Sequence, residues 1–168
     1  MDIAGVPSVD VAFRSTVDSV IGLGTDFFAL IVLVAIIMAF AFYFGRDRLT
    51  ALIAGMYAAV PLYLNFPYTS VFNGNPYLIV GYFVFCVVFA MIAFSGLAGY
   101  LSSDTASFFK TLGLSVLAAG LLLAIAINML PIREIYTLSP ATLALFTSNH
   151  AFFWWLLAPL FGVFFLGR

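Results

Sequence analysis

Residues 27–45 read FFALIVLVAIIMAFAFYFG, nineteen residues without a charged side chain. A helix rises about 1.5 Å per residue, so a stretch of this length reaches across the roughly 30 Å hydrocarbon core of a bilayer. The whole chain has this character, since 65% of its 168 residues are hydrophobic, 8% are charged and the net charge is −1. A soluble domain carries about 25% charged residues, and so few charges cannot cover its surface. The sequence therefore predicts an integral membrane protein and excludes a soluble enzyme, a disordered chain and a nucleic-acid-binding protein.

Further apolar stretches follow the first one. We expect clear membrane spans over residues 27–45, 49–66, 77–101 and 108–130. Residues 151–166 are short for a crossing, which usually takes about 17–25 residues, and they contain Pro159. They form a short fifth span, a re-entrant hairpin or an interfacial helix, and their Phe-Trp-Trp cluster is typical of a membrane interface. The expected fold class is thus an all-α membrane protein, with a bundle of four or five transmembrane helices in residues 27–168.

The segment before the first span is acidic. Residues 1–26 contain four aspartates and one base, Arg14. Between residues 8 and 21 the apolar side chains fall mostly on one side of a helical wheel, which favours an amphipathic helix lying on the membrane surface. The alternative is a loosely ordered, solvated tail. In either case Gly22-Leu23-Gly24 is interpreted as a hinge before the first span.

The basic residues predict an orientation. Arg46 and Arg48 follow the first span, Lys110 begins the fourth, and the loop after the second span carries no charge. Cytoplasmic loops carry an excess of Lys and Arg, so these three residues are predicted in the cytoplasm and the N-terminus outside. If the last segment crosses the membrane, Arg168 also lies in the cytoplasm. The cytoplasmic bases then outnumber the outside ones, Arg14 and Arg133, and this excess favours a fifth span.

Groups that could carry chemistry are scarce at membrane depth. The centres of the four clear spans contain no Asp, Glu, Lys, Arg or His, although pumps and proton relays usually place ionisable groups there. His150 is interpreted as a structural or interfacial residue, and Cys86 as a small packed one. We therefore expect a non-enzymatic protein without a catalytic, cofactor or metal site, whose partners are the bilayer and a homo-oligomer or larger membrane complex.

The clearest organised pattern is small residues spaced four apart. Such stripes let helix backbones approach closely, which is a main source of helix association in lipid. They either hold one monomer together or face another copy or another protein, and the stripe around Gly55 is the first candidate for assembly. In the last stripe an amide, that of Asn128, must also find a partner. The positions are Ala51, Gly55 and Ala59; Ser95 and Gly99; and Gly120, Ala124 and Asn128.

The turn after the first span resembles that of a known family. Phe44-Gly45-Arg46-Asp47-Arg48-Leu49 is similar to the turn after the first helix of colicin V production protein-like membrane proteins, where a glycine and a basic residue lead straight into the second helix. The chain departs from that pattern at residues 47–49, where the family usually has a second glycine, and in the additional residues 151–166. The resemblance implies a bacterial inner-membrane protein with about four helices, linked to secretion or envelope maintenance, without known catalytic residues.

Packing stripes without ionisable groups in the clear spans favour an accessory or scaffold subunit in secretion or envelope processes. The alternative is an oligomeric passive pore or permease component for a small neutral solute, because carbonyls and hydroxyls could line such a path.

Overall fold

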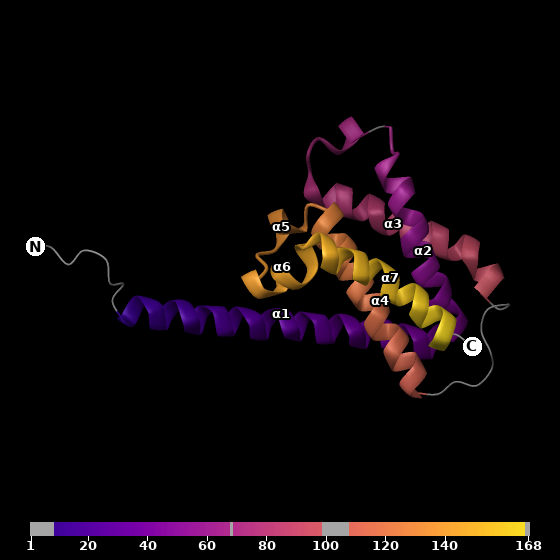
Figure 1. The fold of residues 1–168 in the computed structure, drawn as a ribbon. Helices are drawn as coiled ribbons and strands as arrows, with labels where there is room; N and C mark the ends of the chain where they lie inside the picture. Colours follow the sequence, from indigo (N-terminus) through magenta and orange to yellow (C-terminus); the bar gives the residue numbers. More distant parts are fainter. Residues whose placement is uncertain (1–8, 68, 99–107, 167–168) are drawn as a thin grey trace, which may run out of the picture.

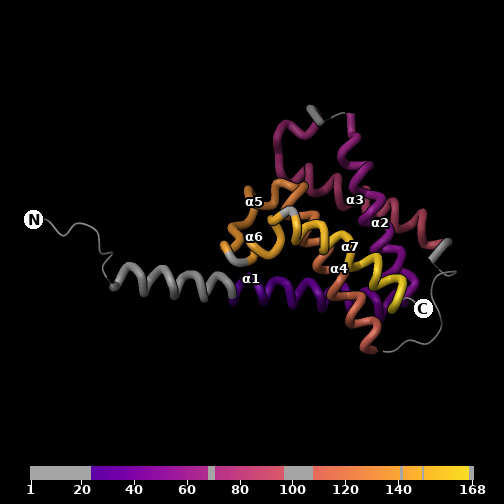
Figure 2. The backbone as a smooth tube through the Cα atoms, in the orientation of Figure 1, coloured from indigo at the N-terminus to yellow at the C-terminus, as the bar shows by residue number. Residues whose placement is uncertain are grey.

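A computed structural model describes residues 9–67, 69–98 and 108–166, and every regular element in these ranges is helical (Figure 1). Figure 2 traces the same path as a tube. The elements are α1 (Val9–Phe44), α2 (Arg46–Leu64), the 3-10 helix η1 (Thr69–Phe72), α3 (Pro76–Ala98), α4 (Phe108–Met129), α5 (Ile132–Ile135), α6 (Pro140–Thr147) and α7 (Asn149–Leu166).

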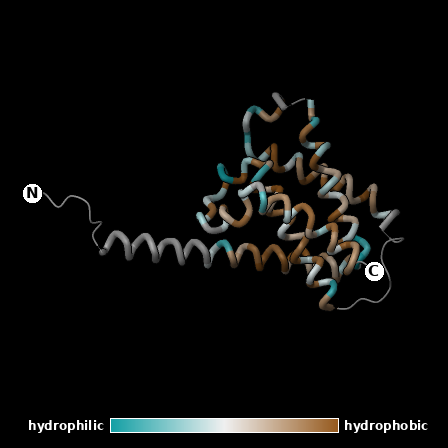
Figure 3. Tube along the Cα trace, viewed as in Figure 1, coloured by the Kyte–Doolittle hydropathy of each residue, from teal (hydrophilic) through white to brown (hydrophobic). Residues whose placement is uncertain are grey.

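Three helices are long and apolar enough to cross a membrane: Gly24–Phe44 of α1, Pro76–Gly96 of α3 and Phe108–Met129 of α4. A shorter apolar helix covers His150–Leu166. Helix α2 is also largely apolar, but it begins with the charged run Arg46-Asp47-Arg48. Figure 3 shows hydrophobic residues along the helices and hydrophilic ones concentrated near their ends. The protein is therefore all-helical, with the composition of a membrane protein.

Helix α1 is longer than the sequence analysis predicts. It runs without interruption from Val9 to Phe44, past the expected boundary at residue 26 and through the expected hinge around Gly22. A glycine inside a helix costs only about 1 kcal/mol, and no proline lies between the two ends to break the hydrogen-bond ladder. The helix ends at Gly45, whose φ of 90° is a conformation that favours glycine, and α2 starts at the next residue.

The helices pack around α4. Helices α2 and α3 lie against each other, while α7 and α1 both pack on α4 (Figure 1). The centre is filled by apolar side chains that are almost completely buried, from four helices: Leu49, Ile53 and Met56 of α2, Phe83 of α3, and Leu114, Leu121 and Ile125 of α4, with Ile37 of α1 at its edge. The outward faces of α1, α3 and α7 carry large exposed apolar side chains, as a surface that meets lipid would.

Candidate functional site

The stripe of small residues on α2 packs against α3. Ala51, Gly55 and Ala59 are all buried. A Cβ atom added at Gly55 would lie 2.9 Å from the backbone nitrogen of Met91 and 3.0 Å from the carbonyl oxygen of Val87. Since both neighbours are backbone atoms, the crossing of the two helices requires glycine here. The close approach is thus made within one chain, and this stripe is a helix-packing surface rather than an exposed assembly surface.

The stripe on α4 faces α6 and α7. The ring of Trp155 occupies the space that a Cβ of Gly120 would need, and it stacks on Phe146 with 5.0 Å between ring centroids. Ala124 is fully buried. The side-chain amide of Asn128 donates 2.8 Å hydrogen bonds to the carbonyls of Ala124 and Phe146, so the partner that this amide requires lies at the end of α6. Of the Phe-Trp-Trp cluster, which the sequence predicts at the membrane interface, Trp155 packs between helices because Gly120 leaves room for it.

The remaining small residues lie elsewhere. The hydroxyl of Ser95 donates to the carbonyl of Ile92 at 2.7 Å, within its own helix α3. Its predicted partner Gly99 lies outside the described residues, as does Arg168.

Helix α7 runs antiparallel to α4 along most of its length. Leu166 contacts Gly113, Gly162 contacts Leu117, and Trp155 sits on Gly120. The paired residue numbers fall on one helix as they rise on the other, so the end of α7 lies beside the start of α4.

A hydrogen bond joins the middle of α7 to α2. Pro159 lies inside α7, and its ring nitrogen donates no hydrogen bond to the carbonyl four residues earlier, that of Trp155. The carbonyl of the next residue, Leu156, accepts a hydrogen bond from the Tyr57 hydroxyl. The pair fixes the depth at which α7 lies against α2.

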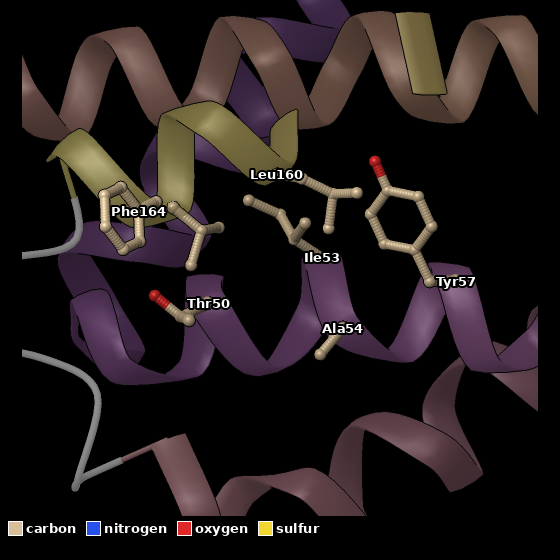
Figure 4. Close-up of a pocket in the computed structure, with 7 residues that line it drawn as sticks. Thr50, Ile53, Ala54, Tyr57, Leu160 and Phe164 are labelled. Carbon is tan, nitrogen blue, oxygen red and sulfur yellow. The ribbon is translucent and has the colours of Figure 1, made fainter. Parts of the chain in front are cut away.

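Between these two helices lies a cavity of about 300 Å³. Figure 4 shows Ile53 and Tyr57 of α2 and Leu160 of α7 pointing into the space between the helices. The side chains of Leu160 and Phe164 are 51% and 54% exposed, so the cavity opens sideways. It is lined by Thr50, Ile53, Ala54, Tyr57, Leu160, Val163 and Phe164.

The cavity begins close to the basic end of the bundle. Its lining residue Thr50 is one turn from Arg46, and the Thr50 hydroxyl donates to the Arg46 carbonyl at 3.4 Å. The Arg46 side chain is buried, whereas Arg48 is exposed and Lys110 half-buried. Stacked rings of Phe42 at the end of α1 and Phe108 at the start of α4, with centroids 6.1 Å apart, place all three bases at the same end of the molecule.

The opposite end contains a buried carboxylate from the acidic segment 1–26, for which the sequence predicts a surface helix or a solvated tail. Asp26 is only 8% exposed, and it accepts a 2.8 Å hydrogen bond from the backbone N–H of Ser139. The Ser139 hydroxyl caps α6 by accepting from the N–H of Thr142. The partners are separated by 113 residues along the chain, so no local pattern predicts the contact.

Neither residue considered for chemistry lines the cavity. His150 is exposed in the first turn of α7, and Cys86 is a buried core residue of α3. In the described ranges no three His, Cys, Asp or Glu side chains gather in a way that could hold a metal ion. The cavity itself offers hydrocarbon walls and two hydroxyls, which suit an apolar ligand.

No protein-family model, curated protein or solved structure matches the chain.

Proposed function

We propose that this protein is a non-enzymatic accessory or scaffold subunit of a bacterial-type inner-membrane complex acting in secretion or envelope processes. The observation that carries the proposal is the exposure of α1. Only 11% of its apolar segment Gly24–Phe44 is buried. A 36-residue helix that contributes so little to its own core offers a long apolar surface to another membrane helix.

The proposed bundle crosses the membrane five times. Asp26 precedes most of the apolar part of α1, and Ser139 follows α4. Because the two residues are hydrogen-bonded to each other, they lie on the same side of the membrane. A return to the same side needs an even number of crossings, which α1, α2, α3 and α4 together provide. Helix α7, antiparallel along α4, adds the fifth. This parity supports α2 as a span despite its charged first turn.

The proposed orientation puts the N-terminus outside. The end of the bundle with Arg46, Arg48 and Lys110 then faces the cytoplasm, in agreement with the excess of basic residues in cytoplasmic loops. The one-residue turn at Gly45 is the feature that resembles colicin V production protein-like proteins, and that resemblance is the source of the proposed link to secretion and the envelope.

Site-specific photo-crosslinking tests the subunit role. A benzophenone amino acid replaces Phe28 of α1 or, as a matched control, Phe85 of α3; these phenylalanines are 68% and 64% exposed. We expect a discrete protein adduct from position 28 after irradiation of native membranes, and only lipid adducts from position 85. Absence of any protein adduct at position 28, together with a lone monomer in mild detergent, would contradict the proposal.

The alternative function, a pore for a neutral solute, draws no support from the cavity. Its walls are mostly apolar, and its two hydroxyls already donate within the chain, to the carbonyls of Arg46 and Leu156. A path for water or a polar solute needs groups that can replace the solute's hydration.

A further inference from the structure

The cavity between α2 and α7 has the chemistry of a hydrocarbon-binding site. Its base is Ile53, which is 1% exposed, and its rim is formed by the half-exposed Leu160 and Phe164. The Thr50 and Tyr57 hydroxyls already donate hydrogen bonds to backbone carbonyls. The cavity walls therefore do not require a polar atom from a ligand. In a membrane-spanning bundle such an opening faces lipid tails.

The two ends of the cavity lie at different distances from the start of α2. Thr50 lies at its end nearest the start of α2, and Tyr57 lies seven residues further along, which is about 10 Å of helix. The start of α2 belongs to the basic end of the bundle, where, among the residues that the structure describes, Arg46, Arg48 and Lys110 outnumber the acid Asp47. An acyl chain in the cavity would therefore have its headgroup beside an excess of positive charge.

We propose that this cavity binds one anionic phospholipid, with an acyl chain between α2 and α7 and the phosphate headgroup at the basic end. Basic sites between transmembrane helices are suited to anionic headgroups, and each Lys or Arg near the surface adds to the attraction. The apolar walls hold the chain and the charged end selects the headgroup. This inference rests on the placement in a membrane and does not depend on the subunit role.

Native mass spectrometry measures the binding. The full-length protein in detergent is titrated with phosphatidylglycerol or with phosphatidylcholine carrying the same acyl chains. We expect one phosphatidylglycerol to remain bound, with an affinity about tenfold higher than that of phosphatidylcholine, because two or more nearby bases favour the negative headgroup. Equal binding of the two lipids would overturn the headgroup assignment.

Two matched variants test the cavity. Ala54→Phe fills it from α2, whereas Ala39→Phe adds the same ring to the exposed face of α1. We expect Ala54→Phe to lower phosphatidylglycerol affinity about tenfold, the effect of excluding about two methylene groups, and Ala39→Phe to leave it unchanged. Undiminished binding by Ala54→Phe would overturn the site, and so would an equal loss in both variants.

A second measurement avoids any dependence on the folding of Ala54→Phe. A benzophenone amino acid at Phe164, on the rim of the cavity, is irradiated in nanodiscs containing equal amounts of the two phospholipids. We expect the lipid adduct to be predominantly phosphatidylglycerol, and a control at Phe85 to give both lipids equally. The same ratio at both positions would overturn the proposal. The crosslinking of α1 is a separate readout, so failure of the lipid site and failure of the subunit role are distinguishable.

Discussion

Helices α1 and α4 are both apolar enough to cross a membrane, but they occupy opposite environments. The segment Gly24–Phe44 of α1 has a mean hydropathy of 2.8 and is 11% buried, whereas α4 has a mean hydropathy of 2.2 and is 56% buried. The more hydrophobic helix is thus the less buried one. Lipid tails are as apolar as a protein core, so hydrophobicity does not select the central helix. Close packing selects it, and α4 has the small residues that permit close packing, at positions including Ser115, Ala118, Ala119, Gly120 and Ala124.

The largest effect is expected from removing the same side chain in the two helices. Ile125 of α4 is fully buried, while Ile36 of α1 is 60% exposed. Ile125→Ala should lower the free energy of unfolding by about 2–5 kcal/mol because it leaves a cavity. Ile36→Ala should change it by less than about 0.5 kcal/mol, as is usual for a surface substitution. Reversible unfolding in mixed micelles measures both, and equal losses would break the contrast between the helices.

Adding a side chain gives the complementary experiment. Gly120→Leu places atoms where the Trp155 ring lies and should cost about 1–3 kcal/mol through overpacking. Ala35→Leu adds bulk to an exposed position of α1 and should be close to neutral. Trp155 fluorescence, recorded in a Trp154→Phe background in which it is the remaining tryptophan, should also shift in Gly120→Leu. An unchanged spectrum and stability would mean that α7 is not seated on α4.

The smallest effect concerns the hydrogen bond that anchors α1. Asp26→Leu removes the acceptor of the buried Ser139 N–H and should cost about 1–2 kcal/mol. Asp47→Leu, at an exposed acid, is the control and should cost less than about 0.5 kcal/mol. A disulfide formed between cysteines introduced at positions 26 and 139 would verify the proximity independently. Efficient formation is expected only if the outer parts of α1 and α6 meet.

The helices of the bundle are predictable from the sequence, because a long uncharged apolar run is typical of a helix in a membrane. The helices α2, α3, α4 and α7 begin and end within a few residues of the predicted spans, apart from the end of α3, where residues 99–101 lie outside the described ranges. The stripe around Gly55 predicts a close helix approach, and the structure has one. The orientation and the crossings by α2 and α7 stay predictions.

The contacts between distant segments are not predictable in this way. Neither the burial of Asp26 nor its bond to Ser139 has a local signature, since an aspartate before an apolar run is also typical of a solvated helix end. The cavity is not predictable either, because its lining comes from α2 and α7, two helices far apart in the sequence, and no motif marks it. The short helices α5 and α6 depend on similar tertiary contacts, such as the Asn128 amide on the Phe146 carbonyl.

The seam between α4 and α7 also constrains the order in which the protein is built. A ribosome makes α4 first, so the face of α4 with Gly113, Leu117 and Gly120 enters the membrane before its cover exists. Until α7 follows, lipid must solvate that face, and the backbone near Gly120 lacks the indole that later shields it. Docking of α7 then covers this face of α4 with Trp155, Gly162 and Leu166.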